Sequence, residues 1–256
     1  MNNTLKRISY RLFGLLGALP RGQRAIILMY HSIGDNGSFF TVSADQFRKQ
    51  MEYLDLRGFN VVRLSDLVAM LKSGTLPPKT VALTFDDGYI DNYYEAYPIL
   101  KRHGFPATVF LATGFVGKKM ENSSGRSLEI MDWDKIREME QGGLMEFEPH
   151  SASHGKNWLS GEGAAEREIA QSRSEIESKL SKSCKLFAYP SGRYDDAAVK
   201  SLQRQGFAAA FTVKGGKACV RDDLFRLKRN SIDSRVSLDM FKIIARQGRI
   251  NLPPHL

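Results

Sequence analysis

Short apolar runs alternate with amphipathic stretches along most of this chain. The runs are rich in β-branched and aromatic residues and predict strands at 25–30, 59–63, 80–85, 107–112, 144–148, 185–189, 208–213 and 225–232. Between them, apolar positions at helical spacing predict helices at about 44–57, 65–73, 91–103, 133–141, 162–181, 195–205 and 237–246. This alternation indicates an α/β protein with a parallel sheet, either closed into a (β/α) barrel or open and doubly wound.

The closed barrel is the better interpretation, because no nucleotide-binding signature of the GxGxxG or GxxxxGK[ST] type follows a strand. Residues 25–250 are expected to form a single domain, since nothing after residue 25 has the composition of an interdomain linker. Residues 251–256 are expected to be a C-terminal tail. In a barrel of this kind, chemistry is expected where strands end and the following loops begin.

The first 24 residues stand apart as a basic segment. The net charge of the chain is +9, and this segment contributes basic residues without any acid: Lys6, Arg7, Arg11, Arg21 and Arg24. Its apolar residues recur at helical spacing, which predicts a helix that lies either on an anionic membrane surface or on the domain itself. The apolar stretch is too short to span a bilayer, and no clear signal-peptide cleavage site follows it. We therefore expect a cytoplasmic or peripheral membrane protein rather than an extracytoplasmic one.

The rest of the composition excludes two further classes of site. No basic face interleaved with aromatic residues occurs within the domain, so a nucleic-acid partner is not expected. Cys184 and Cys219 have no metal-ligand spacing. One disulfide between them is compatible with the sequence, but two reduced structural thiols are the preferred interpretation.

Two carboxylates end the predicted strand 80–85. The motif TFDDG places Asp86 and Asp87 at its carboxyl end, where two buried acids without partners would be costly. An ordinary strand end and Asp-Gly turn is one explanation. In the functional explanation, successive side chains of an extended backbone diverge, so one carboxylate can bind a metal while the other faces a substrate water.

Two of the five histidines form the motif HSASH, which follows the predicted strand 144–148. Because His150 and His154 are four residues apart, they can bind one metal ion from a single turn or a tight loop. With one carboxylate they predict a two-His, one-Asp site that leaves positions open for water and substrate. The alternative is a loop with two unrelated histidines.

Two other strand ends carry candidate groups. The stretch FAYPSGRYDD, residues 187–196, runs from a strand into a Pro-Gly loop whose backbone N–H groups could bind an oxyanion. The stretch ILMYH, residues 27–31, ends an apolar strand in a histidine. His31 is either a core histidine bonded to a backbone carbonyl or a working group at a strand end.

The motifs TFDDG, HSASH and AYPSG, in this order, resemble those of the polysaccharide deacetylase family, the NodB-homology carbohydrate esterases. AYPSG stands where the family usually has R-x-P-[YF]-G. The resemblance covers roughly residues 25–235 and implies a distorted (β/α) barrel of about seven strands. It also implies a hydrolase that uses Zn²⁺, or another divalent transition metal such as Co²⁺ or Ni²⁺, to remove acetyl groups from an N-acetylated polysaccharide or lipid-linked glycan.

The same resemblance assigns roles to individual residues. It makes Asp86 the general base and assigns the metal to Asp87, His150 and His154. Backbone N–H groups of the loop 189–192 would stabilise the oxyanion; this loop consists of Tyr189, Pro190, Ser191 and Gly192.

The family's late L-x-x-H motif, which supplies the general acid, has two matches here. LPPH, residues 252–255, contains two prolines, which cannot belong to a central strand. LMYH, residues 28–31, lies on a predicted strand at the other end of the sequence. Because the first and last strands of a barrel are neighbours, we assign the acid to His31. This permuted motif order resembles that of the family branch that deacetylates poly-N-acetylglucosamine.

The chain departs from the family pattern at several positions. Ala188 stands where the family often has the arginine that orients the base carboxylate, and Ser191 replaces the usual aromatic residue. Arg229 could reach the site from another strand, but a solvated surface arginine is an equal alternative. Asp233 is a faint candidate for the family's late aspartate. His103 is predicted to sit at the C-terminal end of a helix, where the macrodipole favours it.

Two other functions stay open on the sequence. One is the hydrolysis of a different C–N bond, such as deformylation of a lipid-linked amino sugar. The other is a glycan-binding barrel without catalysis, which the intact acid and histidine pairs argue against.

Overall fold

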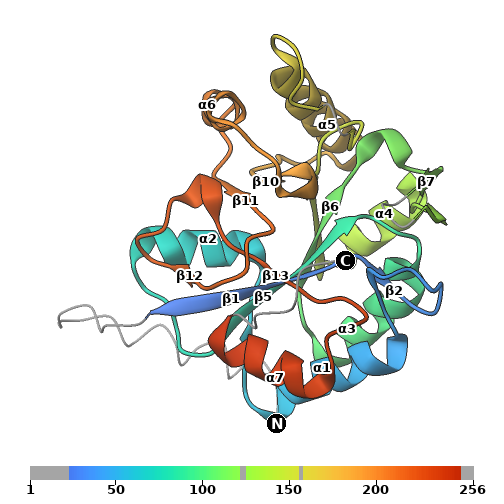
Figure 1. The fold of residues 1–256 in the computed structure, drawn as a ribbon, viewed down its shortest axis with the longest axis vertical. Coiled ribbons are helices and arrows are strands. Elements are labelled where there is room, and N and C mark those ends of the chain that lie inside the picture. The colour runs from blue at the N-terminus through green and yellow to red at the C-terminus, as the bar shows by residue number, and fades with distance from the viewer. Residues whose placement is uncertain (1–22, 122–124, 156–157, 249–256) are drawn as a thin grey trace.

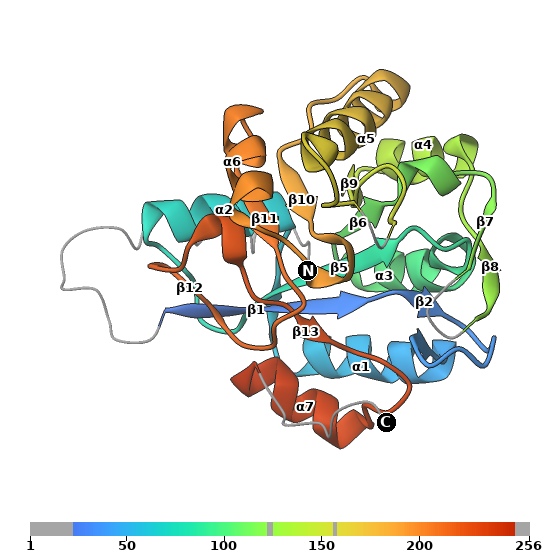
Figure 2. The ribbon, with the colours of Figure 1, turned by 45° about the horizontal axis from the view of Figure 1, so that its top comes forward.

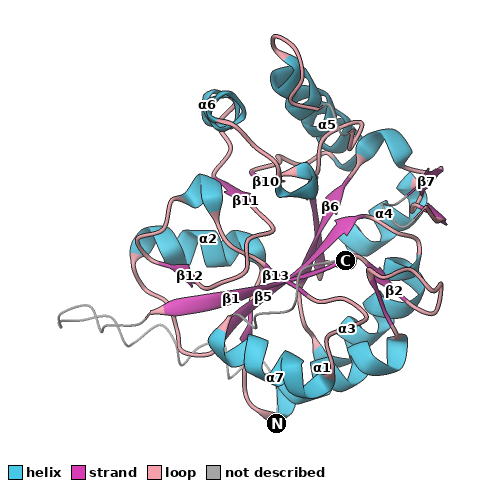
Figure 3. Ribbon diagram, viewed as in Figure 1, coloured by secondary structure: helices cyan, strands magenta, loops and turns pink. Residues whose placement is uncertain are grey.

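A central, mostly parallel sheet organises the protein (Figures 1 and 3). The computed structural model describes residues 23–121, 125–155 and 158–248. Neighbouring strands of the sheet follow the order β12 (Ala218–Cys219), β1 (Arg24–Tyr30), β5 (Thr80–Asp87), β6 (Ala107–Leu111) and β9 (Met145–Pro149). In addition, β13 (Asn230–Ser231) pairs with β1, and β4 (Asn60–Val61) pairs with β5. Only the pairing of β12 with β1 is antiparallel in this sheet.

Two further strands continue the curve of this sheet. β10 (Leu186–Ala188) and β11 (Ala209–Phe211) are parallel neighbours, and Phe211 forms a parallel bridge with Leu227, in the segment that leads to β13. Backbone pairing therefore runs from β9 through β6, β5, β1 and β13 to β11 and β10. Among the described residues, no backbone ladder joins β10 back to β9. The predicted barrel is thus present as a curved sheet that its backbone hydrogen bonds do not close.

Side chains of β9 and of the residue that follows it bridge the remaining gap. The buried carboxylate of Glu148 accepts hydrogen bonds from the backbone N–H groups of Lys185 (2.9 Å) and Leu186 (2.8 Å). One residue past the end of β9, the Nδ1 atom of His150 lies 2.7 Å from the carbonyl oxygen of Ala188. Both side chains therefore point towards β10 and take the place of ladder hydrogen bonds.

Helices surround the sheet, as Figure 3 shows in cyan. They are α1 (Ala44–Leu56), α2 (Leu64–Ser73), α3 (Tyr97–His103), α4 (Trp133–Gln141), α5 (Ala164–Leu180), α6 (Asp196–Arg204) and α7 (Leu238–Gln247). Figures 1 and 2 show α7 beside α1, although the two are far apart in the sequence. The rings of Tyr53 and Phe241 meet edge-on between them, with centroids 6.2 Å apart. Each predicted helix is present, and that at 91–103 is divided into a π-helix, η2 (Asn92–Ala96), and α3.

The predicted strand at 225–232 is wrong over its first half. A short 3₁₀ turn, η5 (Leu224–Arg226), occupies that part, and only Asn230 and Ser231 form a strand. The carboxylate of Asp223 accepts a hydrogen bond from the N–H of Phe225 and thereby caps the turn. Several strands of two or three residues were not predicted: β2 (Ser32–Ile33), β3 (Thr41–Val42), β7 (Lys119–Glu121), β8 (Ser127–Glu129) and β12. Runs this short carry no periodicity and form only because a partner lies beside them.

Alternate residues of the central strands face two different cores. Ile26, Leu28 and Tyr30 of β1 belong to the large core under α1, α3, α4 and α7. Ala25 and Ile27 face the inner side of the curved sheet, together with residues of β10, β11 and α2. The same alternation on β5 puts Ala82 on the inner side and therefore also Thr84 and Asp86.

Several sequence predictions concern residues that the structure does not describe. Residues 1–22 of the basic segment and the tail 251–256, with His255, lie outside the described residues, so the predicted membrane contact stays a prediction. Within the described part, no helix combines the length and apolar character needed to cross a bilayer. Cys184 and Cys219 are both free thiols.

The bridge from β9 to β10 predicts a specific loss of stability. Glu148→Ala leaves the buried N–H of Leu186 and the part-buried N–H of Lys185 without an acceptor, at a cost of about 1–3 kcal/mol for the buried group and less for the other. Glu148→Gln retains an amide oxygen in the same place and should lose less. Urea unfolding should rank the variants in this order, with Glu52→Ala on the exposed side of α1 within about 0.5 kcal/mol of the parent. Equal losses in the Ala and Gln variants would contradict the bridging role.

Candidate metal centre

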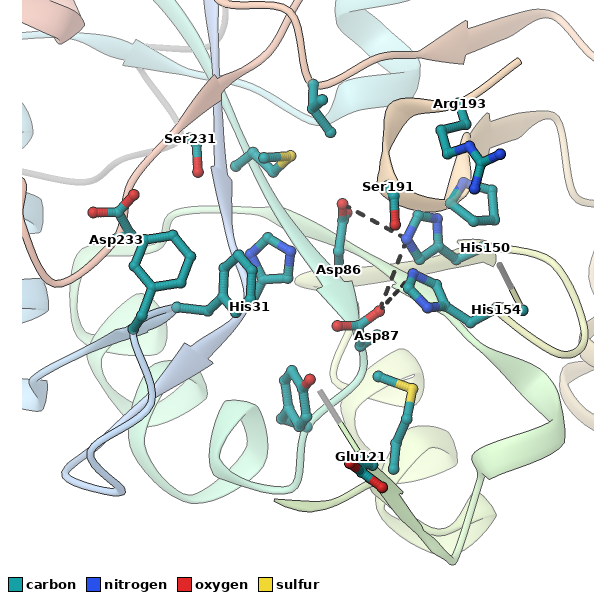
Figure 4. A pocket seen from close by; sticks show the side chains of 18 of the residues that line it. His31, Asp86, Asp87, Glu121, His150, His154, Ser191, Arg193, Ser231 and Asp233 are labelled. Carbon is teal, nitrogen blue, oxygen red and sulfur yellow. Dashed lines mark ion pairs between the residues drawn. The ribbon is translucent and has the colours of Figure 1, made fainter. Parts of the chain in front are cut away.

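A cleft of ≈ 890 Å³ opens at the carboxyl ends of β1, β5 and β9 (Figure 4). Its lining includes five residues singled out from the sequence: His31, Asp86, Asp87, His150 and His154. The structure therefore brings together the ends of three strands whose motifs are far apart in the chain. Aromatic side chains line other parts of the wall: Phe39, Phe40, Tyr89 and Trp158.

One carboxylate and two imidazoles form a compact ligand set. The candidate ligand atoms of Asp87, His150 and His154 all lie within 4.8 Å of one another. Nε2 of His154 is 3.4 Å from Oδ1 of Asp87, and Nε2 of His150 is 3.8 Å from the same oxygen. This oxygen is buried and has no hydrogen-bond partner among the described residues. Two imidazole nitrogens and a carboxylate oxygen are a common ligand set for zinc, so these residues fit a divalent cation.

Backbone contacts set the tautomer of His150. A carbonyl oxygen can only accept a hydrogen bond, so the contact with Ala188 requires the proton on Nδ1 and leaves the lone pair on Nε2, which faces Asp87. Burial lowers the pKa of His150 to about 4, which keeps the ring neutral. A neutral imidazole with Nδ1–H bonded to a carbonyl is the form in which histidine binds metals.

Unusual backbone conformations aim these ligands. Asp87 has φ = 73°, so the chain leaves the extended conformation at the last residue of β5. In an uninterrupted strand, Asp87 would face the side opposite to Asp86. Ser151 and His154 also have positive φ, 66° and 47°. Such conformations cost about 1–3 kcal/mol each in residues other than glycine and cluster at functional sites.

The loop that carries the two histidines is fixed from α5. The carboxylate of Glu168 accepts hydrogen bonds from the backbone N–H groups of Ala152 (3.0 Å) and Ser153 (2.8 Å). Inside the loop, the N–H of His154 donates to the hydroxyl of Ser151 (3.0 Å). Glu168 was not identified from the sequence. No local sequence pattern shows that a side chain on a helix will accept hydrogen bonds from a loop that precedes the helix.

Beside the ligand set, Asp86 forms a buried, bidentate ion pair with Arg229. The two guanidinium nitrogens lie 2.6 and 2.7 Å from the two carboxylate oxygens, and both side chains are at most 2% exposed. Nε of Arg229 donates to the carbonyl oxygen of Thr212, and its Cζ atom lies 5.3 Å from the centroid of the Phe110 ring. Arg229 is thus not a surface arginine. It contacts the Asp86 carboxylate from another segment of the chain, whereas position 188, where the family often has an arginine, is an alanine.

This environment determines the charge of Asp86. Burial acts to raise the pKa of Asp86, but the positive charge and hydrogen bonds of Arg229 outweigh it, and the pKa falls well below its usual range. Oδ2 of Asp86 lies 3.8 Å from Nε2 of His150. An ionised carboxylate therefore stands next to the ligand set without being part of it.

His31 lies on the other side of the two carboxylates from His150 and His154 in Figure 4. Its ring packs on Phe40, with centroids 4.8 Å apart, and it is partly exposed in the cleft. Asp233 also lines the cleft, but its carboxylate accepts hydrogen bonds from the backbone N–H and guanidinium of Arg235. His103 ends α3 and pairs with Asp55.

The loop 189–192 contributes less of its surface than predicted. The side chain of Tyr189 is buried, and its hydroxyl donates to the carbonyl oxygen of Phe225. The N–H groups of Tyr189 and Gly192 donate to backbone carbonyls, and Pro190 has none. Ser191, with φ = 52°, is thus the residue of this loop left to offer an N–H to the cleft. At Gly192 a Cβ atom would lie 2.4 Å from Val213, which excludes larger residues.

The ion pair of Asp86 with Arg229 predicts a large loss of stability on breaking it. Arg229→Met leaves a buried carboxylate without its counter-charge, which should cost about 3–5 kcal/mol in urea unfolding. Arg226→Met is the matched control, because Arg226 pairs with Asp223 and Asp196 at the surface and should contribute about 1 kcal/mol or less. Combining Arg229→Met with Asp86→Leu should recover part of the loss. Additive losses in that double variant would contradict a direct pair.

The contacts of Glu168 predict a loss of metal affinity. Glu168→Ala frees the backbone of the histidine loop and should weaken Zn²⁺ binding by roughly 10- to 100-fold, as loss of supporting contacts around metal ligands commonly does. Competition with a chromophoric chelator measures this directly. Glu166→Ala, on the same helix and paired with Arg204 at the surface, should leave the affinity unchanged. An unaltered affinity in Glu168→Ala would show that the loop holds its shape without this side chain.

Comparison with known proteins places this geometry in a family. The family model described as polysaccharide deacetylase matches residues 73–210. Among curated relatives, Bacillus subtilis YxkH is 30% identical over 217 residues, covering 84% of this chain and 74% of YxkH. The poly-β-1,6-N-acetyl-D-glucosamine N-deacetylase of Staphylococcus epidermidis is 24% identical over 216 residues, covering 81% of this chain and 72% of that protein.

Solved structures agree with this comparison. The Streptococcus pyogenes deacetylase PplD, in complex with acetate, is 28% identical with a TM-score of 0.74, covering 86% of this chain and 96% of PplD. IcaB from Ammonifex degensii is 26% identical with a TM-score of 0.76, covering 88% of this chain and 98% of IcaB. The predicted fold class and family are therefore confirmed. Since the family model spans more than half of the chain, and a relative is 30% identical over most of both sequences, this chain belongs to the polysaccharide deacetylase family.

Proposed function

We propose that this chain is a metal-dependent hydrolase that removes the N-acetyl group from an N-acetylhexosamine unit of a polysaccharide. Asp87, His150 and His154 hold the metal, Asp86 is the general base and His31 is the general acid. The observation that carries the proposal is the position of an ionised carboxylate, Asp86, 3.8 Å from the nearest nitrogen of the ligand set.

A divalent cation bound by the ligand set would supply Lewis acidity, which lowers the pKa of a water and polarises the amide carbonyl. The ion pair with Arg229 lowers the pKa of Asp86 and keeps it ionised. Asp86 is therefore a weak base, and it serves as one because it is deprotonated and lies next to the ligand set. It takes the proton from the attacking water. The guanidinium of Arg229 is already protonated and cannot accept this proton, so its task is to hold both carboxylate oxygens in place during this step.

Attack on the amide carbon produces an oxyanion and then requires protonation of the leaving amine. The N–H of Ser191 is the backbone donor of the loop that remains for the oxyanion. Asp86 and the ligand histidines have other tasks, so the proton for the amine comes from His31, across the cleft. C–N cleavage then yields acetate and a free amino sugar.

The preferred metal is Zn²⁺, with Co²⁺ and Ni²⁺ as alternatives, because two imidazoles and one carboxylate suit these borderline cations better than Mg²⁺ or Ca²⁺. The similarity to poly-β-1,6-N-acetyl-D-glucosamine N-deacetylases supports an N-acetylglucosamine polymer as substrate. A cleft of ≈ 890 Å³ with aromatic side chains in its wall, including Phe39 and Trp158, is compatible with a sugar chain that extends beyond the reacting unit.

Metal removal and single substitutions test this proposal. Protein treated with a chelator should release no acetate from β-1,6-linked N-acetylglucosamine oligomers, and Zn²⁺, Co²⁺ or Ni²⁺ should restore release. His31→Gln should keep its metal content and lose roughly 100- to 10,000-fold in rate. His103→Gln, at the end of α3 and paired with Asp55, is the matched control and should retain full rate.

Each part of the proposal has its own contrary outcome. Acetate release by the stripped protein would exclude metal dependence. Full rate in His31→Gln would exclude it as the acid. Formate release from N-formylated sugars, without acetate release from their N-acetyl counterparts, would identify the enzyme as a deformylase.

A further inference from the structure

The turn that follows the two carboxylates reaches back to the strand end that carries His31. The carboxylate of Asp91 accepts hydrogen bonds from the hydroxyl of Ser32 (2.5 Å) and the backbone N–H of Ile33 (3.1 Å). The side-chain amide of Asn92 donates to the carbonyl oxygen of His31 (2.8 Å). Three consecutive residues after β1 are therefore bonded to two consecutive residues at the start of η2.

These contacts begin where the sheet stops holding the strand. The pairing of β1 with β5 ends at Tyr30 opposite Phe85, so His31 lies one residue beyond the last ladder pair. Asn92 is fully buried, and its Nδ2 atom also lies 3.1 Å from Asp91. Beyond the end of the β1–β5 ladder, the segment after β5 therefore contacts the segment after β1 through the side chains of Asp91 and Asn92 instead of backbone hydrogen bonds.

The neighbouring polar groups fix the direction of these hydrogen bonds. The hydroxyl of Ser32 accepts from the side-chain amide of Asn36 (2.7 Å), so its own proton is available for Asp91. Asn36 also accepts from Thr41 (2.6 Å), at the start of β3. Asp91 thus acts as an acceptor for two donors of the His31 segment, and the loop from Ser32 to Thr41 is anchored through the same carboxylate.

The anchored loop also carries the side chain that touches the His31 ring. Phe40 lies next to Thr41, and its ring packs on His31 at 4.8 Å. The backbone of His31 is thereby held by Asn92, and its ring is held by a loop that Asp91 fixes. π-Helical turns such as η2 are rare and occur frequently at functional sites.

We propose that Asp91 and Asn92 are positioning residues that hold His31 at the correct place opposite the ligand set for proton transfer to the leaving amine. The proposal rests on the proposed function, in which His31 is the acid. Neither residue touches substrate; both act through the backbone and the loop around His31.

Two variants and a matched control test the proposal. Asn92→Ser removes the donor to His31, and Asp91→Asn removes one acceptor while keeping the size of the side chain. Each should lower kcat for acetate release between roughly 10- and 100-fold, the scale expected for an ångström of misplacement, with KM and Zn²⁺ affinity unchanged. Glu95→Gln, exposed on the same π-helix, should leave kcat unchanged.

Combination with His31→Gln separates positioning from a general loss of structure. If Asn92 acts through His31, Asn92→Ser should have little further effect on kcat in the His31→Gln background. The same factor of loss in both backgrounds would overturn the proposal. So would an unchanged kcat in both Asn92→Ser and Asp91→Asn.

An NMR measurement keeps this test independent of the proposed function. The chain has only five histidines, and the His31 imidazole signal is identified by its absence in His31→Gln. That signal should shift or broaden in Asn92→Ser and Asp91→Asn and stay in place in Glu95→Gln. If His31→Gln has full activity, the acid assignment fails, while the NMR signal still reports whether Asp91 and Asn92 hold the ring. An unmoved signal overturns the positioning role.

Discussion

The ion pair between Asp86 and Arg229 is the interaction on which the rest of the site depends. It joins β5 to the segment before β13, residues 143 apart in the chain, on the inner side of the curved sheet. A buried ion pair seldom stabilises a fold more than apolar residues of the same volume. Here it keeps a carboxylate ionised at 3.8 Å from a candidate metal ligand, and this charge state is what the proposed role of Asp86 as general base requires.

The closure of the sheet and the ligand set share residues. His150 bonds to β10 through Nδ1 and faces Asp87 through Nε2, so the contact that bridges β9 to β10 also orients a ligand. Glu148, two residues earlier, bridges the same gap without facing the cleft. In a regular barrel, backbone hydrogen bonds would join β9 to β10, and these two side chains would not be needed for that contact. The open side of the barrel and the geometry of the site therefore arise together.

Backbone strain is concentrated around the same cleft. Of the six non-glycine residues with positive φ in the described chain, four belong to the site or its loops: Asp87, Ser151, His154 and Ser191. Lys79 and Ser181 are the others. At these four site residues, the positive φ turns a side chain or an N–H away from the direction that a regular strand or helix would give it. The carboxylate of Glu168 accepts a hydrogen bond from the backbone of the histidine loop, the carbonyl oxygen of Ala188 accepts one from the His150 ring, and both contacts offset this cost.

The sequence by itself determined the α/β class, the positions of the helices and main strands, and the motifs that meet in the cleft. These depend on local periodicity and on residue types next to strand ends, such as the acids after the strand at 80–85 and the histidines after that at 144–148. Only the tertiary structure decided that Arg229 pairs with Asp86 and that Tyr189 turns away from the cleft. It also decided that Asp91, Asn92 and Glu168 are bonded to the loops around the site. Those contacts join residues far apart in the chain or depend on positive φ, and no local pattern encodes either.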